Sequence, residues 1–146
     1  MSHWPTDEIR SVALERLDER FRRYRLGDAA AERAVRQSLE RYGQLAPIVI
    51  WEQDESLVLI DGFKRLQAAR TLKGTETLAA RCLEVDAPAA KAALYTLNRL
   101  SRPPQELEEA WIVHALVRED GLSQVDVGAL LGRHKSWVNR RLAMWE

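Results

Sequence analysis

Two consecutive prolines, Pro103 and Pro104, divide this chain of 146 residues more sharply than any other feature of its sequence. Proline lacks a backbone N–H and clashes with the preceding turn of a helix, so a pair of prolines ends one helix and enforces an extended link. Before the pair, strand-like and helix-like segments alternate, and after it every segment has a helical pattern. The sequence therefore predicts an α+β fold: a small mixed α/β N-terminal domain followed by an all-helical part.

The part before the prolines contains two kinds of segment. β-Branched and aliphatic runs bounded by polar turns predict strands, whereas apolar residues spaced three and four apart predict helices. The predicted strands are 47–51, 57–60 and 78–85. The predicted helices are 14–24, 28–42, 63–72 and 86–100, with Asp28 and Asp86 as the N-caps of the second and the fourth. On this basis we divide the chain into an N-terminal helical arm (1–29), an α/β domain (30–100) and a helical region (101–146).

Charge is distributed unevenly along the chain, although 22 basic and 22 acidic side chains cancel overall. A neutral chain is not expected to coat nucleic acid without specificity. Residues 101–131 carry six acids against two arginines, whereas residues 132–142 carry only cations. These four cations are Arg133, Lys135, Arg140 and Arg141. A solvated helix face also explains such a cluster, so the surrounding pattern decides between the two.

Several classes of protein are excluded by simpler features. The longest apolar run, 46–51, is far shorter than the roughly 20 residues of a membrane-spanning helix. The N-terminal residues lack the basic and apolar regions of a secretory signal, and the single cysteine, Cys82, forms no intrachain disulfide or zinc site by itself. No arrangement of nucleophile, base and acid is recognisable, so no catalytic residue is predicted. We expect a cytoplasmic protein with no membrane partner.

Residues 123–145 have the pattern of a helix-turn-helix. Ser123 with Asp126 approximates a capping box, and Gly132 suits the positive φ at the end of a first helix. The second helix of such a motif enters the major groove, where Arg, Lys and Asn side chains bind base edges. Trp145, at its end, is expected to be buried. The predicted DNA-binding residues are Ser123, Gln124, Arg133, His134, Lys135, Ser136, Asn139 and Arg140.

Two other functions share this helical pattern. A helical hairpin inside a core, or one that docks a partner protein as an adaptor, has the same apolar spacing. Four cations without an acid on an exposed second helix favour double-stranded DNA over both. Because a single reading helix gives modest affinity, we expect a homodimer that binds two half-sites.

A second informative segment is the turn at Gly62, between a predicted strand and a predicted helix. Unpaired N–H groups at a helix start, with Lys64 and Arg65 in the first turn, suit a phosphate group. A glycine between a strand and a helix also serves as a plain turn. A nucleotide-dependent enzyme, such as a CTP hydrolase or a kinase-like protein acting at this turn, is a further alternative.

Four segments together resemble the ParB family of plasmid and chromosome partition proteins, over about residues 35–145. Their order and spacing are more specific than any one of them. The segments are 44–50 (the family's first box, a glutamine and a proline before a strand), 61–68 (its G-E-R-R-x-R-A box), 97–102 (its E-N-x-x-R box) and 122–142 (its helix-turn-helix).

The resemblance implies a ParB/sulfiredoxin-like N-terminal domain that binds CTP, often with Mg²⁺. It also implies sequence-specific binding of double-stranded DNA in partition or in plasmid or mobile-element regulation, with the protein on nucleoid or plasmid DNA. By position, Gly62, Lys64 and Arg65 would face the phosphates, and Asn98 would lie near the metal. The cofactor-binding positions carried over in this way are Gln44, Gly62, Phe63, Lys64, Arg65, Asn98 and Arg102.

The sequence departs from the family pattern at three positions. Phe63 and Leu97 replace glutamates, and Gln67 replaces an arginine. Leucine cannot coordinate Mg²⁺, which prefers hard oxygen ligands, so CTP hydrolysis is not expected, although Lys64 and Arg65 can still hold a nucleotide. Sulfiredoxin, which the predicted fold also resembles, carries a reactive cysteine where Phe63 stands. Cys82 is predicted to be a core residue, so a redox function is not expected.

Overall fold

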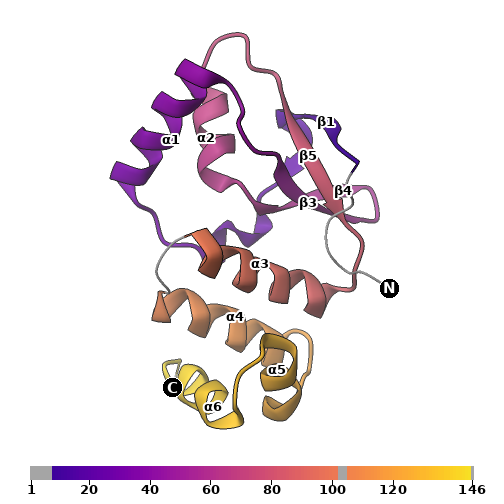
Figure 1. Ribbon diagram of the computed structural model, residues 1–146. Coiled ribbons are helices and arrows are strands. Elements are labelled where there is room, and N and C mark those ends of the chain that lie inside the picture. Colours follow the sequence, from indigo (N-terminus) through magenta and orange to yellow (C-terminus); the bar gives the residue numbers. More distant parts are fainter. Residues whose placement is uncertain (1–7, 102–104, 146) are drawn as a thin grey trace. The chain divides into compact units, whose positions relative to one another are not determined.

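The computed structural model describes residues 8–101 and 105–145, and its contacts divide the chain into two compact units, Met1–Val85 and Asp86–Glu146. Among the described residues, the first unit holds a five-stranded sheet with two α-helices, and the second holds four α-helices (Figure 1). The predicted α+β class is therefore confirmed. The helix over Ala87–Ser101, α3, falls in the second unit, whereas the sequence predicts a boundary after residue 100; the domain boundaries themselves stay a prediction.

The sheet of the first unit is built around two apolar strands, β3 (Ile48–Gln53) and β4 (Ser56–Asp61). In sheet order the strands are β1 (Arg10–Ala13), β5 (Thr77–Leu83), β3, β4 and β2 (Leu17–Asp18). β3 pairs in parallel with β5 and antiparallel with β4, and Ile48, Ile50 and Leu59 are completely buried. Cys82, on β5, is also buried, and burial raises the pKa of its thiol. The prediction that Cys82 is a core residue is therefore confirmed.

Two helices, α1 (Ala29–Tyr42) and α2 (Phe63–Thr71), lie side by side in the first unit (Figure 1). The predicted cap Asp28 begins α1 by accepting a hydrogen bond from the Ala31 N–H, at 3.1 Å. Gly43 ends the helix. Only Leu39 of α1 is buried, so most of this helix faces solvent.

The N-terminal helix predicted over 14–24 is wrong. The segment instead forms β1, β2 and two short 3₁₀ helices, η1 (Leu14–Arg16) and η2 (Arg20–Tyr24). Leu14 and Leu17, and then Phe21 and Tyr24, are buried. The two residues of each pair are three positions apart. Both a 3₁₀ turn and an α-helix place residues with this spacing on the same side, so the spacing does not distinguish them. Because β1 pairs with β5 and β2 with β4, the segment forms short strands in place of a continuous α-helix.

Glu19 ties this N-terminal segment to α2. Its carboxylate accepts hydrogen bonds from Arg22 in η2 and from Arg70 in the last turn of α2. Partial burial acts to raise the pKa of Glu19, but the hydrogen bonds and charges of the two arginines outweigh it, so its pKa is lowered. The stabilisation is therefore present above the pKa of an unfolded glutamate, and it is lost as the pH falls through the lower folded value.

Replacing Glu19 by glutamine is expected to lower the free energy of unfolding at pH 7 by about 1 kcal/mol, the scale of a partly exposed ion pair. The difference from the unmodified chain should shrink below about pH 4, because acid protonates Glu19. Urea unfolding at both pH values measures this, with the exposed Glu40→Gln as the matched control. An equal difference at both pH values would contradict the role given to the carboxylate.

The second unit contains α3, α4 (Glu106–Arg118), α5 (Gln124–Leu131) and α6 (Lys135–Ala143). The predicted cap Asp86 accepts a hydrogen bond from the Ala89 N–H at 3.0 Å. α4 contacts each of the other three helices, and its Ile112 and Leu116 are almost completely buried. The two prolines that predict the link between α3 and α4 lie outside the described residues. No helix in the described part of the chain combines the length and the apolar character needed to cross a bilayer.

Candidate functional site

The helices α5 and α6 are joined by three residues and are capped at each junction. Ser123 accepts a hydrogen bond from the Asp126 N–H at 3.1 Å, as the capping pattern predicts. Gly132 ends α5 with a φ of 69°. His134 caps α6, because its Nδ1 accepts a hydrogen bond from the Ser136 N–H at 3.1 Å. The predicted helix ends in this region are confirmed, whereas their use in DNA binding stays a prediction.

The turn after α5 packs directly against Gly128. The Arg133 N–H donates to the Gly128 carbonyl at 2.8 Å. A Cβ on residue 128 would lie 2.5 Å from the Arg133 carbonyl oxygen, closer than real Cβ contacts allow. The glycine therefore permits the close approach of the turn to α5.

The four cations of this segment fall into two groups. Lys135 and Arg140 are exposed and make no ion pair with any residue of the described chain. Arg133 and Arg141 are instead held by neighbours: the Arg133 Nε donates to the Tyr95 hydroxyl at 2.8 Å, and the Arg141 Nε donates to Glu109 at 3.1 Å. Only part of the cationic cluster is therefore open to an external ligand.

One side of α6 is polar and the other is buried. Trp137, Val138 and Leu142 are buried against the unit, so Asn139 and Arg140, one helical turn after Lys135 and Ser136, share the outward side with them. At the start of α5, Ser123 is exposed and Gln124 is half-buried. The residues placed on solvent-accessible positions of this helix pair are Ser123, Gln124, Arg133, His134, Lys135, Ser136, Asn139 and Arg140.

The prediction that Trp145 is buried is wrong, because 48% of the residue is exposed. Its ring stacks on His114 with the ring centroids 4.4 Å apart, and its indole N–H donates to the Ala110 carbonyl at 3.1 Å. The indole therefore lies on the surface of α4 and covers it with one face, which an amphipathic ring can do without entering the core.

The turn at Gly62 is shaped for a residue without a side chain. Its φ is 113°, and a Cβ there would lie 2.4 Å from Cγ2 of Ile48. Among the described residues no side chain caps α2, in contrast to α1, α5 and α6. The first N–H groups of α2 are therefore not bonded to a capping side chain, and Lys64 stands in the same turn.

Two residues carried over to the nucleotide site by resemblance make hydrogen bonds inside the first unit. The Arg65 guanidinium donates to the carbonyls of Ala46 and Pro47, at 2.6 and 2.8 Å, and to the Asp61 carboxylate at 3.1 Å. The Gln44 side chain bonds both backbone groups of residue 79, at 2.7 and 2.8 Å. These contacts fix the loop before β3, and a contact of either residue with a nucleotide stays a prediction.

Further cations surround the Gly62 turn that sequence reasoning missed. The guanidinium carbons of Arg22 and Arg25 lie 5.5 and 5.3 Å from the centroid of the Phe63 ring, which is buried. The run of arginines in residues 20–25 was visible in the sequence, but a wrong helix prediction gave no reason to bring it to this turn. Phe63 thus packs beneath two guanidinium groups.

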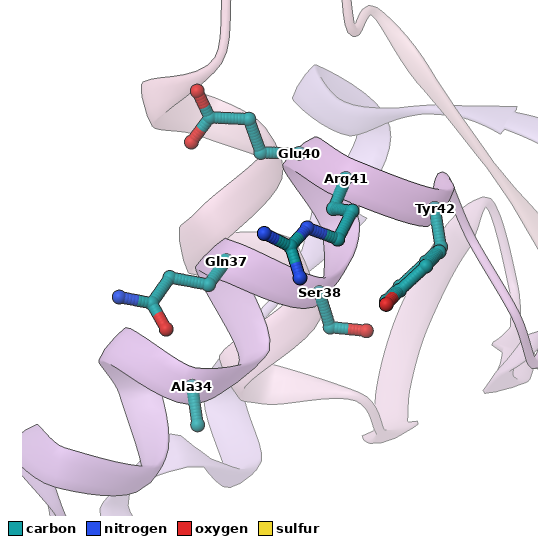
Figure 2. Close-up of a pocket in the computed structure, with 6 residues that line it drawn as sticks. All are labelled: Ala34, Gln37, Ser38, Glu40, Arg41 and Tyr42. Atoms are coloured by element: carbon teal, nitrogen blue, oxygen red, sulfur yellow. The ribbon is translucent and has the colours of Figure 1, made fainter.

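An open groove of about 240 Å³ lies between α1 and α2. Lys64 lines it from α2, and Arg33 and Arg36, which are exposed, line it from α1. Glu32 is the acid in the same lining. This excess of cations makes the α1–α2 side of the first unit suited to an anionic group. A second open pocket, of about 720 Å³, runs along another part of α1 (Figure 2). None of its lining residues is a predicted site residue; they are Ala34, Gln37, Ser38, Glu40, Arg41 and Tyr42.

Asn98, which the resemblance places near Mg²⁺, is bonded to a carboxylate of its own unit, and a metal at this position stays a prediction. The Asn98 amide N–H donates to the Glu108 carboxylate at 2.9 Å, and both side chains are buried. Leu97 offers no oxygen, and no group of three or more His, Cys, Asp and Glu side chains in residues 8–101 and 105–145 could hold a metal ion. Glu108, ten residues away on α4, is a partner that the sequence did not reveal. Arg102 lies outside the described residues.

Comparison with known proteins identifies the fold. No protein-family model and no curated protein matches the chain. The structure of ParB from Caulobacter crescentus in a complex with CTP-gamma-S is similar to this chain at a TM-score of 0.57 and 20% identity, and the match covers 94% of this chain and 78% of ParB. For the same protein in a complex with the centromeric parS site, the TM-score is 0.56 and the identity 19%, and the match covers 93% of this chain and 71% of ParB.

Two further solved structures share the fold. The pNOB8-like ParB N-domain covers 94% of this chain with 66% of its own at a TM-score of 0.65 and 18% identity. Sulfiredoxin from Arabidopsis thaliana covers 60% of this chain with 97% of its own at a TM-score of 0.52 and 22% identity. The chain therefore has a ParB-like fold, which sulfiredoxin shares over 60% of the chain, as the resemblance implies.

Proposed function

We propose that this protein is a ParB-like, sequence-specific double-stranded DNA-binding protein that acts in DNA partition or in plasmid or mobile-element regulation. The observation that carries the proposal is the outward side of α6, where Lys135, Asn139 and Arg140 are exposed and the opposite side is buried. The likeness of the fold to a ParB structure complexed to the centromeric parS site supports the same reading.

The chemistry of this surface suits a major groove. Lys and Arg donate to guanine O6 and N7, and Asn pairs with adenine, so Lys135, Asn139 and Arg140 offer three base-reading groups. Ser123 and Gln124, at the start of α5, suit a phosphate group at the backbone. Specific binding by one short reading helix needs a second half-site, so the active species is a homodimer on DNA.

Selection from random duplexes, repeated with CTP present, tests this proposal. We expect one enriched sequence, arranged as two half-sites whose centres lie about one helical turn or a multiple of it apart. A change of enrichment or of affinity on adding CTP would support coupling between the two units. A pool that stays random after repeated rounds would contradict sequence-specific binding.

Lys135→Ala and Arg140→Ala are each expected to weaken duplex binding about tenfold, because each removes one exposed cation from the proposed interface. The slope of log Kobs against log [salt] should also fall in magnitude by about one for each cation that contacts a phosphate. Fluorescence anisotropy at several salt concentrations measures both quantities. Lys73→Ala, which removes an exposed lysine of the first unit, is the matched control.

Affinity for duplex DNA that is insensitive to salt would contradict the DNA interface. If the unmodified chain bound a protein and not DNA, the adaptor alternative would replace the proposal. Retained affinity in both alanine variants would show that another surface carries the binding.

In the first unit, we propose that the Gly62 turn binds the phosphates of CTP. Support comes from the uncapped start of α2, from Lys64 and from the cations around the α1–α2 groove, and from the likeness to a ParB structure complexed with CTP-gamma-S. Calorimetric titration with CTP should show binding that Lys64→Ala weakens and Lys73→Ala does not. Release of CDP over hours would favour the CTP hydrolase alternative. An unaltered titration curve for Lys64→Ala would contradict the proposal that the Gly62 turn binds phosphate.

A further inference from the structure

Arg140 and Arg141 are adjacent in the sequence and have the same chemistry, but the structure separates them. Arg140 is exposed on the polar side of α6. The side chain of Arg141 is only 16% exposed and turns toward α4. One position along a helix is a rotation of about 100°, so two neighbours can lie on different sides.

The contacts of Arg141 are with α4 and with its own helix. Its Nε donates to the Glu109 carboxylate at 3.1 Å, where the glutamate side chain is 6% exposed, and Glu106 lies within ion-pair distance at 3.9 Å. Its guanidinium carbon lies 4.9 Å from the centroid of the Trp137 ring. A charge-assisted hydrogen bond between two nearly buried groups fixes geometry more strongly than a surface ion pair does.

Trp137 extends these contacts from α6 to α3. The ring is buried and meets the Tyr95 ring edge-on, with the centroids 5.9 Å apart. Arg133 lies over the same indole ring at 4.8 Å and donates to the Tyr95 hydroxyl. The inner side of α6 is therefore held against two other helices of its unit by polar and aromatic contacts.

We infer that Arg141 is a positioning residue for DNA reading: through Glu109 and Trp137 it sets the rotation of α6 about its axis, and it does not itself contact DNA. The inference rests on the proposed function of α6. Rotation of α6 decides whether Asn139 and Arg140 reach base edges, because groove recognition needs each donor within hydrogen-bond distance. Arg141 then acts through its neighbours and leaves the count of phosphate contacts unchanged.

The adjacent arginines provide a matched pair of variants, Arg140→Gln and Arg141→Gln. Both are expected to weaken binding to the selected duplex by about tenfold. Arg140→Gln removes a cation from the side of α6 that faces DNA, so the magnitude of the salt slope should fall, by about one at most, whereas Arg141→Gln should leave the slope unchanged. A salt slope reduced by Arg141→Gln, or an affinity equal to that of the unmodified chain, would overturn the inference.

The sign of the change in DNA affinity caused by Glu109→Gln distinguishes a positioning role of Arg141 from a phosphate contact. If Arg141 contacted a phosphate, removing the acid would free the arginine and reduce repulsion of DNA, so binding would strengthen. A positioning role predicts the opposite, a loss of about tenfold with an unchanged salt slope. The double variant Glu109→Gln with Arg141→Gln should bind no more weakly than either single variant, because both remove the same contact. Tighter binding by Glu109→Gln overturns the inference.

A control separates positioning from loss of folding. Circular dichroism fixes the folded fraction of each variant at the assay temperature, and affinity is compared per folded molecule. Amide hydrogen exchange without DNA should show reduced protection of α6 in Arg141→Gln and not in Arg140→Gln; equal protection overturns the inference. If the unmodified chain binds no duplex, the proposed function itself is wrong. If Arg140→Gln leaves the salt slope unaltered while Arg141→Gln weakens binding, only the contact assigned to Arg140 is wrong.

Discussion

Asp120→Ala is expected to lower the free energy of unfolding of the helical unit by about 3 kcal/mol, because it leaves a buried cation without its main partner. Lys91, on α3, is only 5% exposed, and its ammonium lies 2.7 Å from the Asp120 carboxylate in the turn between α4 and α5. Water cannot replace the lost anion at so buried a site. The same ion pair joins α3 to the segment that leads into α5, so the loss should loosen the start of α5 as well.

Urea unfolding followed by circular dichroism measures the effect, and Glu119→Ala is the matched control. Glu119 also pairs with Lys91, at 3.4 Å, but its side chain is 46% exposed. An exposed partner of this kind contributes about 1 kcal/mol or less. Equal destabilisation by the two variants would show that burial of the Lys91–Asp120 pair is not the cause.

Gly62→Ala is expected to destabilise the α/β unit by about 3 kcal/mol, the sum of a left-handed backbone strain and of overpacking. The added Cβ would lie 2.4 Å from the Ile48 side chain, which is completely buried in the central strand and cannot move away without disturbing the sheet. The substitution should also weaken CTP binding, since the turn and the start of α2 would shift together.

Gly74→Ala separates the two causes. Gly74 has a φ of 85°, but a Cβ there meets nothing within 4 Å, so only the backbone strain of about 1–2 kcal/mol remains. Thermal unfolding of both variants gives the difference. If Gly74→Ala costs as much as Gly62→Ala, the contact with Ile48 contributes nothing, and the argument for a sterically required glycine at residue 62 fails.

Local signals in the sequence sufficed wherever a residue acts on its own segment. The caps Asp28, Asp86 and Ser123 and the helix end at Gly132 are confirmed by their hydrogen bonds or dihedral angles. The central strands were predictable because strands buried in a sheet become continuous apolar runs. In each case the residues that determine the local structure lie close to it in the sequence.

The failures have long-range causes. In the N-terminal segment, residues 10–13 and 17–18 become strands because β1 pairs with residues 77–80 and β2 with residues 57–58, and no local propensity contains that information. The partners of Arg65 and Arg141 are likewise not visible in the sequence: they are an aspartate and two carbonyls for Arg65, and a glutamate 32 residues away for Arg141. Composition counts charges, whereas only tertiary contacts show which of them are already paired.

Amide chemical-shift mapping of the isotope-labelled chain, titrated with the selected duplex, tests the central claim most directly. Binding by the outward side of α6 predicts the largest shifts in residues 134–140, smaller shifts at Ser123 and Gln124, and little change in the sheet of the first unit. Shifts concentrated on the first unit, with α6 unaffected while the duplex is bound, would contradict the claim.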